Sequence, residues 1–181
     1  MMKTRPWMMI LLGILCFALV PRNAGAQLPN GYGAAIGVET ARKIAAAAAA
    51  EGKKNGWNVA VAIVDPAGEL VFFERMDNTQ AGSIAVSQDK ARTAARFKRP
   101  TKAFEDALVG GRQAILGLPG VVPLEGGIPL LIDGKIVGAI GVSGATSQQD
   151  GICAQAGADT LGKAPAPAPT PTPPAPRPVK K

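Results

Sequence analysis

The clearest hydrophobic pattern in the chain has a period of two over residues 57–64, WNVAVAIV, which predicts a β-strand. The large side chains of Trp57, Val59, Val61 and Ile63 face one way, and smaller or polar residues face the other. The next four residues, DPAG, have the residue types of a type I turn, and residues 70–74 form the returning strand. This pattern predicts a β-hairpin over residues 57–75.

A second hairpin is expected where residues 128–132 and 135–142 flank Asp133-Gly134, a favoured two-residue turn. One face of its second strand carries Val137, Ala139, Gly141 and Ser143 and is nearly bare. Glycines weaken a strand unless something approaches its backbone closely. Either a tightly packed helix or a flat ligand lies over this face.

Four segments are predicted to be helices, the first because its apolar residues recur at spacings of three and four. They are residues 33–54, 83–97, 101–108 and a last helix that runs to Leu161. The inner face of the second segment is expected to hold Ile84, Ala91, Ala94 and Ala95. The last helix opens with a capping box, formed either by Thr146 with Gln149 or by Ser147 with Asp150. Residues 116–127, with four glycines and two prolines, are expected to form a loop.

The order of these elements predicts an α+β fold: an antiparallel sheet of about five strands, with two hairpins, flanked by α-helices. Parallel βαβ units fit poorly, because tight turns join both pairs of strands.

The two ends of the chain differ from this pattern. Residues 1–26 have a basic start, an apolar run and a small-residue cleavage site, and so predict a signal peptide. Residues 163–181 form a tail rich in proline and alanine, which we interpret as a disordered spacer, a ligand for a peptide-binding module or a stalk. One domain, residues 27–162, lies between them. We expect a periplasmic or secreted protein with no membrane span after cleavage.

The charge of the whole chain, +7, does not describe this domain. Seven of the 20 basic residues lie in the two end segments, which leaves as many basic as acidic residues in the domain. The seven are Lys3, Arg5, Arg22, Lys163, Arg177, Lys180 and Lys181. A neutral domain has no general footprint for nucleic acid, so we expect no nucleic-acid partner.

The chain has no histidine, which excludes Ser-His-Asp and Cys-His catalysis, histidine metal sites and a proximal histidine on haem. Ser143 lies in GVSGA, which resembles a nucleophile elbow but lacks its usual base. We interpret Ser143 either as a residue at a helix start or as one that offers backbone N–H groups to an anion. After cleavage Cys153 is the only cysteine, and it is a small buried side chain, an intersubunit disulfide or a ligand. Nothing in the sequence requires an enzyme.

The helix over residues 83–97 is basic, with Lys90, Arg92 and Arg96. These side chains are either a solvated face or a site for the carboxylates of a ligand.

Three segments in this order resemble the GlcG/HbpS family of haem-binding proteins. They are VAIVDPAGELVFFERMDN at residues 61–78, DKARTAARF at 89–97, and GGIPLLIDGKIVGAIGVSGATSQQD at 126–150. The resemblance implies an α+β domain, a homo-oligomer and haem as ligand. Some members are exported and linked to redox or haem sensing.

The resemblance also implies a ligand-binding surface. Together with the basic helix and the GVSGA segment, it gives the candidates Arg75, Met76, Lys90, Arg92, Thr93, Arg96, Phe97, Gly126, Gly127, Pro129 and Ser143. Arg92 and Arg96 would pair with haem propionates, and the two glycines would let the backbone approach a flat ring. Without histidine, the iron ligand would be Met76, Tyr32, Cys153, the hydroxyl of Thr93 or Thr101, or water.

The sequence therefore predicts an exported, non-enzymatic, homo-oligomeric protein that binds haem or a similar flat tetrapyrrole, to sequester or sense it. Two alternatives remain open. One is a module that binds a small anion or metabolite, and the other is a structural homo-oligomer without a ligand.

Overall fold

The structure is a computed structural model that describes residues 30–162. The predicted signal peptide and the proline-rich tail lie outside these described residues. The helices are α1 (Val38–Asn55), α2 (Ser83–Phe97), α3 (Lys102–Val109) and α4 (Ser147–Ala158), with short 3-10 helices η1 (Gln113–Gly117) and η2 (Asp159–Leu161). The strands are β1 (Ala60–Val64), β2 (Leu70–Arg75), β3 (Gly127–Ile132) and β4 (Lys135–Ser143). No helix within residues 30–162 is long and apolar enough to span a membrane.

The strands form one antiparallel sheet in the order β2-β1-β4-β3, which confirms the α+β fold and both hairpins. The described residues contain four strands, one fewer than the expected five. Where β1 ends, the segment before α1 continues along β4 with a single parallel bridge between Tyr32 and Ile136. This segment occupies the place beside β4 that a further strand would take.

The first helix begins at Val38, five residues later than the expected start at Gly33. The reason is that residues 33–36 bond to β4 instead of to each other: the N–H of Gly33 donates to Ile136 (2.8 Å) and that of Ile36 to Val137 (2.9 Å). Gly33 itself fits closely, because an added Cβ would lie 3.1 Å from the Cβ of Lys135.

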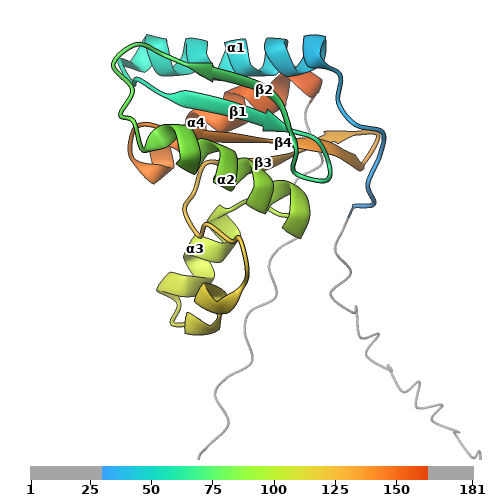
Figure 1. Cartoon of the computed structure of the whole chain (residues 1–181), viewed down its shortest axis with the longest axis vertical. Helices are drawn as coiled ribbons and strands as arrows, with labels where there is room; N and C mark the ends of the chain where they lie inside the picture. The colour runs from blue at the N-terminus through green and yellow to red at the C-terminus, as the bar shows by residue number, and fades with distance from the viewer. Residues whose placement is uncertain (1–29, 163–181) are drawn as a thin grey trace, which may run out of the picture.

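Helices cover both faces of the sheet (Figure 1). On one face α1 and α4 pack on the large side chains of Val59, just before β1, and of Val61 and Ile63 within it, as the period of two predicted. On the other face α2 places Ala91, Ala94 and Ala95 against Ala62, Val64 and Ala139.

The prediction for Val137 is wrong, because this side chain faces α1 and α4 rather than sharing the face of Ala139. The pairing of β3 with β4 shifts between Leu130 and Leu131, which leaves Val137 as an extra residue. Such a bulge reverses the alternation of side chains along a strand.

The bare face of β4 is explained by close packing of α2. A Cβ on Gly141 would lie 2.0 Å from the carbonyl oxygen of Ser87 and 2.5 Å from the backbone nitrogen of Ala91. The helix therefore occupies the space directly over this glycine, and the alternative of a flat ligand at this position is wrong.

Both predicted turns are present. The N–H of Gly68 donates to the carbonyl of Asp65 (3.0 Å), and the Asp65 carboxylate accepts the N–H groups of Ala67 and Glu69. Asp133 and Gly134 both have positive φ, 50° and 72°, as a primed hairpin turn requires. These turns fix the register of the two hairpins.

Thr146 and Gln149 form the capping box of α4, the first of the two predicted arrangements. The N–H of Gln149 donates to Thr146 Oγ1 (3.4 Å), and the N–H of Thr146 donates to Gln149 Oε1 (3.1 Å). We expect Thr146→Ala to lower the free energy of unfolding by about 1 kcal/mol in urea denaturation, since an uncapped N–H is left. The neighbouring Ser147→Ala is the control, and equal losses in both variants would contradict this role.

Residues 102–125, here called the arm, contain α3, η1 and the following loop. Figure 1 shows α3 and η1 below the sheet, on the side away from α1. The ends of the arm are joined by Thr101 and Gly127: each N–H donates to the other residue at 2.9 Å. Four large apolar side chains of the arm are exposed: Val109, Leu116, Leu118 and Leu124.

Candidate functional site

Lys90, on α2, is not part of a solvated basic face. Its side chain is almost completely buried, at 2% exposure, and its ammonium lies 2.7 Å from Asp150 Oδ2. It also donates to the carbonyl of Val142 at 3.1 Å. This ion pair joins α2, β4 and α4 at one point inside the fold, so the Lys90 ammonium is already paired with groups of the protein.

Both carboxylate oxygens of Asp150 accept a hydrogen bond. Its second oxygen accepts the N–H of Ala145 at 3.0 Å. Burial raises the pKa of Asp150, while Lys90 and the backbone N–H groups of Ala145 and Gly144 oppose this rise. The carboxylate is therefore costly to bury and depends on its partners to remain charged.

Gly126 and Gly127 leave the space that the close packing around Lys90 and Asp150 requires. A Cβ on Gly126 would lie 2.7 Å from the Val142 carbonyl and 3.0 Å from Lys90 Nζ, and φ at Gly126 is +125°. A Cβ on Gly127 would come within 2.4 Å of the Lys90 carbonyl. Both glycines are buried, so what approaches their backbone closely is the protein's own α2, β4 and Thr101.

Two further candidates are also buried and bonded within the fold. Thr93 Oγ1 donates to Gly120 (3.2 Å) and accepts the N–H of Val122 (3.0 Å), and so holds the arm against α2. Ser143 Oγ lies 3.3 Å from Ser83 Oγ, at the junction of β4 and α2. Ser143 ends β4 and does not lie at the start of α4, so its predicted position at a helix start is wrong.

Arg92 and Arg96, by contrast, reach solvent, with side chains 31% and 48% exposed. Arg92 pairs with Asp89 (3.0 Å) on its own helix. Arg96 Nε donates to the carbonyl of Ala67 (2.9 Å) and so clamps the turn between β1 and β2. Both side chains are thus partly exposed and also bonded within the protein, Arg92 additionally to Gln88 (3.3 Å) and Arg96 additionally to Glu69 (3.7 Å).

Three further candidates, Phe97, Pro129 and Arg75, are partly or fully exposed. Phe97 packs edge to face on Phe104 of α3, with ring centroids 5.5 Å apart, at the junction of α2 and the arm. Pro129 pairs with Ala139 on β3, the strand at the edge of the sheet. Arg75 is exposed at the end of β2. These three candidates thus come from three different elements, α2, β3 and β2.

Met76 is separated from the other candidates. Its half-buried side chain packs against the core beneath α1 and α4, on the opposite face of the sheet from α2. The structure therefore does not bring Met76 together with Arg92, Arg96 or Phe97.

Tyr32 is hydrogen-bonded to the backbone, whereas Cys153 is buried in the core. The Tyr32 hydroxyl donates to the carbonyls of Ala95 (3.0 Å) and Arg96 (3.2 Å), where α2 ends. Cys153 is fully buried in the core, and burial raises the pKa of its thiol to about 11.

This position predicts low reactivity of Cys153. At about pH 8 its thiolate population is on the order of a hundredfold below that of an ordinary thiol, and burial blocks access as well. In a chain that carries Cys16→Ser, we expect Ellman's reagent to label Cys153 slowly in the native state and at once in guanidinium chloride. Rapid labelling of the native protein would contradict the buried position.

Residues 36–159 match the family model described as "Haem degrading protein HbpS-like". The chain belongs to the HbpS-like family. The resemblance seen in the sequence is thereby confirmed, and with it the family's fold.

Relatives of this HbpS-like chain include the Protein GlcG of Escherichia coli (strain K12). It is 43% identical over 105 residues, which cover 58% of this chain and 78% of GlcG. An uncharacterized 15.0 kDa protein of Citrobacter freundii is 33% identical over 131 residues, which cover 70% of this chain and 92% of that protein.

Solved structures share the fold. A double mutant of Streptomyces reticuli HbpS is 33% identical, with a TM-score of 0.67 over 72% of this chain and 90% of that one. The complex of PduOC with haem is 26% identical, with a TM-score of 0.65 over 71% of this chain and 96% of PduOC.

Proposed function

We propose that this chain binds haem on the α2 side of the molecule, near the point where the arm begins and ends, at Thr101 and Gly127. The observation that carries the proposal is membership of the HbpS-like family together with the similarity to PduOC, which has been solved in complex with haem. We further propose that the chain binds haem without catalysis, either to sequester it or to sense haem or redox state. We also propose that the chain is exported to the periplasm or the cell exterior and assembles into a homo-oligomer.

The accessible residues fit the charged side of haem. Arg92 and Arg96 lie four positions apart on one helix and offer two guanidinium groups, which suit two carboxylates. Phe97 at the end of the same helix, and the exposed Leu118 and Leu124 on the arm, offer apolar surface for the ring. Bound haem would supply a redox-active iron and a strong absorption band.

The candidate iron ligands are less suitable for the iron than the two arginines are for the carboxylates of haem. Thr93 and Thr101 are buried and bonded to the backbone, Cys153 lies in the core, and Met76 lies on the other face of the sheet. Of the candidate ligands only Tyr32 has a large exposed fraction, and its hydroxyl already donates to α2. We therefore propose that water ligates the iron, which gives weak or transient binding.

The arginines give the test of this site. We expect Arg92→Gln combined with Arg96→Gln to weaken haemin binding about 5- to 30-fold, because two charge-assisted contacts are lost. The matched control is Arg42→Gln on α1, an exposed arginine on the opposite face of the sheet. Affinity would be read from the Soret band during titration with haemin. Equal weakening by the control, or no weakening by the pair, would argue against this location.

Haem degradation is the second candidate function, favoured by the description of the family model. The reaction needs oxygen and a reductant from outside the protein. Haemin bound to the protein would be incubated in air with ascorbate, with free haemin and with Arg92→Gln/Arg96→Gln protein as controls. Faster loss of the Soret band with the unaltered protein than with both controls would support degradation, whereas a stable band would support binding alone.

A further inference from the structure

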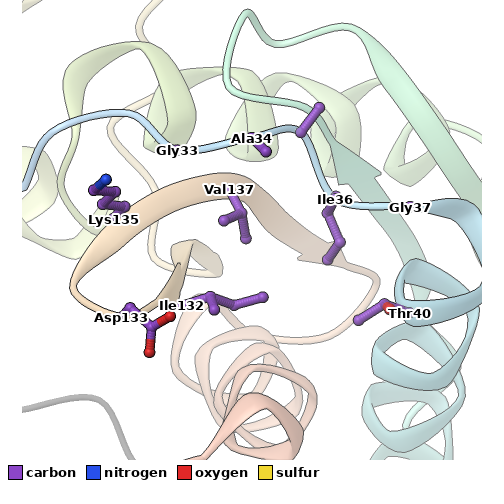
Figure 2. Close-up of a pocket in the computed structure, with 10 residues that line it drawn as sticks. Gly33, Ala34, Ile36, Gly37, Thr40, Ile132, Asp133, Lys135 and Val137 are labelled. Carbon is purple, nitrogen blue, oxygen red and sulfur yellow. The ribbon is translucent and has the colours of Figure 1, made fainter.

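An open pocket lies on the other side of the molecule from the arm, where the segment before α1 crosses the hairpin of β3 and β4 (Figure 2). Its volume is about 330 Å³. The backbone of residues 33–37 forms one wall, and Thr40, Ile132, Asp133, Lys135 and Val137 complete the lining. None of the residues assigned to haem lines this pocket.

The interior of the pocket is apolar. Figure 2 shows the side chains of Ile36, Val137 and Ile132 directed toward one space from three different segments. Ile36 and Val137 are buried, at 7% and 6% exposure, whereas Ile132 is 41% exposed. The three side chains therefore form an aliphatic floor that is still open to solvent.

The size of the pocket limits its ligand. A cavity of about 150 Å³ in another protein holds benzene, so about 330 Å³ holds a molecule on the order of a dozen non-hydrogen atoms. A tetrapyrrole is several times larger than benzene and does not fit. A ligand of this pocket is thus a small molecule and distinct from haem.

The rim carries one acid and one base. Asp133 and Lys135 come from the same tight turn, and neither side chain makes an ion pair with another of the described residues 30–162. A lone carboxylate would be repelled by Asp133, and a lone ammonium would be repelled by Lys135. A head group that carries both charges meets an opposite charge with each of them.

We propose that this pocket binds a small zwitterion with an aliphatic side chain, that is, an amino acid of the leucine class. The side chain lies on Ile36, Ile132 and Val137, the ammonium faces Asp133 and the carboxylate faces Lys135. Contacts with exposed charges are individually weak, so the expected dissociation constant is on the order of 1 mM. The site does not depend on the haem proposal, because it uses different residues on a different part of the surface.

Saturation-transfer difference NMR on the full chain tests this proposal with three compounds of one shape. They are L-leucine, 4-methylpentanoate, which lacks the ammonium, and 3-methylbutylamine, which lacks the carboxylate. We expect the methyl signals of leucine to show transfer that saturates with concentration, with at least a threefold lower dissociation constant than for the other two. Absence of transfer to leucine would overturn the site, and equal affinities would overturn the zwitterion.

Three variants locate the binding. Asp133→Asn is expected to weaken leucine severalfold and to leave 4-methylpentanoate as tight or tighter, and Lys135→Gln is expected to do the same with 3-methylbutylamine. Ile132→Ala should weaken all three compounds, whereas Leu70→Ala, a similarly exposed aliphatic residue on β2, should weaken none. Transfer that is unchanged in Asp133→Asn, Lys135→Gln and Ile132→Ala would show that leucine binds elsewhere. Unchanged haemin binding by these variants would confirm that the two sites are independent.

Discussion

Lys90→Met is expected to lower the free energy of unfolding by about 3–5 kcal/mol, one of the largest losses from any single change in this protein. Methionine keeps a buried apolar stem but removes the ammonium that lies 2.7 Å from Asp150. The Asp150 carboxylate would then be buried without a charge partner. Urea denaturation followed by circular dichroism gives the loss.

The double variant Lys90→Met/Asp150→Asn separates charge from packing. Asparagine has no charge and its side-chain carbonyl still accepts the N–H of Ala145, so most of the loss should be recovered. Arg92→Met, whose exposed ion pair with Asp89 lies on the same helix, should cost less than about 1 kcal/mol. A double variant no more stable than Lys90→Met would contradict the account of the buried pair.

The Lys90→Met loss should also depend on pH. Burial already raises the pKa of Asp150, and removal of Lys90 removes a charge that opposes this rise. A carboxyl whose pKa is higher in the folded than in the unfolded protein favours folding at low pH, and this contribution is lost as the pH rises through the folded pKa. The variant should therefore approach the unaltered protein in stability as the pH falls toward 4.

Gly141→Ala is the second change with a large expected effect, about 3 kcal/mol or more. The new Cβ would lie 2.0 Å from the Ser87 carbonyl oxygen and 2.5 Å from the Ala91 nitrogen. Both are backbone atoms of a helix, so α2 as a whole must move away from β4. The expected result is a lower urea midpoint and increased exposure of the apolar face that α2 covers.

Gly82→Ala is the control for this prediction. Gly82 precedes α2 in a helical conformation, and nothing lies within 4 Å of its added Cβ. It should change the free energy of unfolding by less than about 1 kcal/mol. A Gly141→Ala protein as stable as the Gly82→Ala protein would mean that α2 does not pack on β4 as described.

The elements that were predicted correctly from sequence depend on local signals. The hairpin of β1 and β2 follows from a period of two and from a turn that begins at Asp65, and both lie within 20 residues. The Asp133-Gly134 turn and the Thr146 capping box are equally local. Fold class follows from the order of such elements, which explains why it could be predicted.

The errors involve contacts between distant residues. Lys90 reads as one of several basic residues on a helix, and its partner Asp150 lies 60 positions later, where it reads as a helix cap. The bulge that turns Val137 and the β4 contacts of residues 33–36 depend in the same way on pairing across the sheet. The family resemblance is confirmed, but several residues in its segments, such as Thr93 and Gly127, serve the junction of α2 with the arm.

The candidate site is consequently divided into three parts. Lys90, Thr93, Gly126, Gly127 and Ser143 form a buried junction that supports the arm and α2, and Met76 lies on the opposite face of the sheet. The remaining candidates are partly or fully exposed: Arg75, Arg92, Arg96, Phe97 and Pro129. A period of 3.6 places side chains around a helix but does not show which side the sheet covers, so this division required the structure.

Titration of haemin into the purified chain that begins at Gln27 shows whether this protein binds haem. We expect a saturable shift of the Soret band that ends near one haem per chain, with weak affinity because no histidine ligates the iron. A spectrum that equals free haemin at every ratio, in a protein that unfolds cooperatively, would contradict haem binding. The family membership would then stand for a shared fold alone.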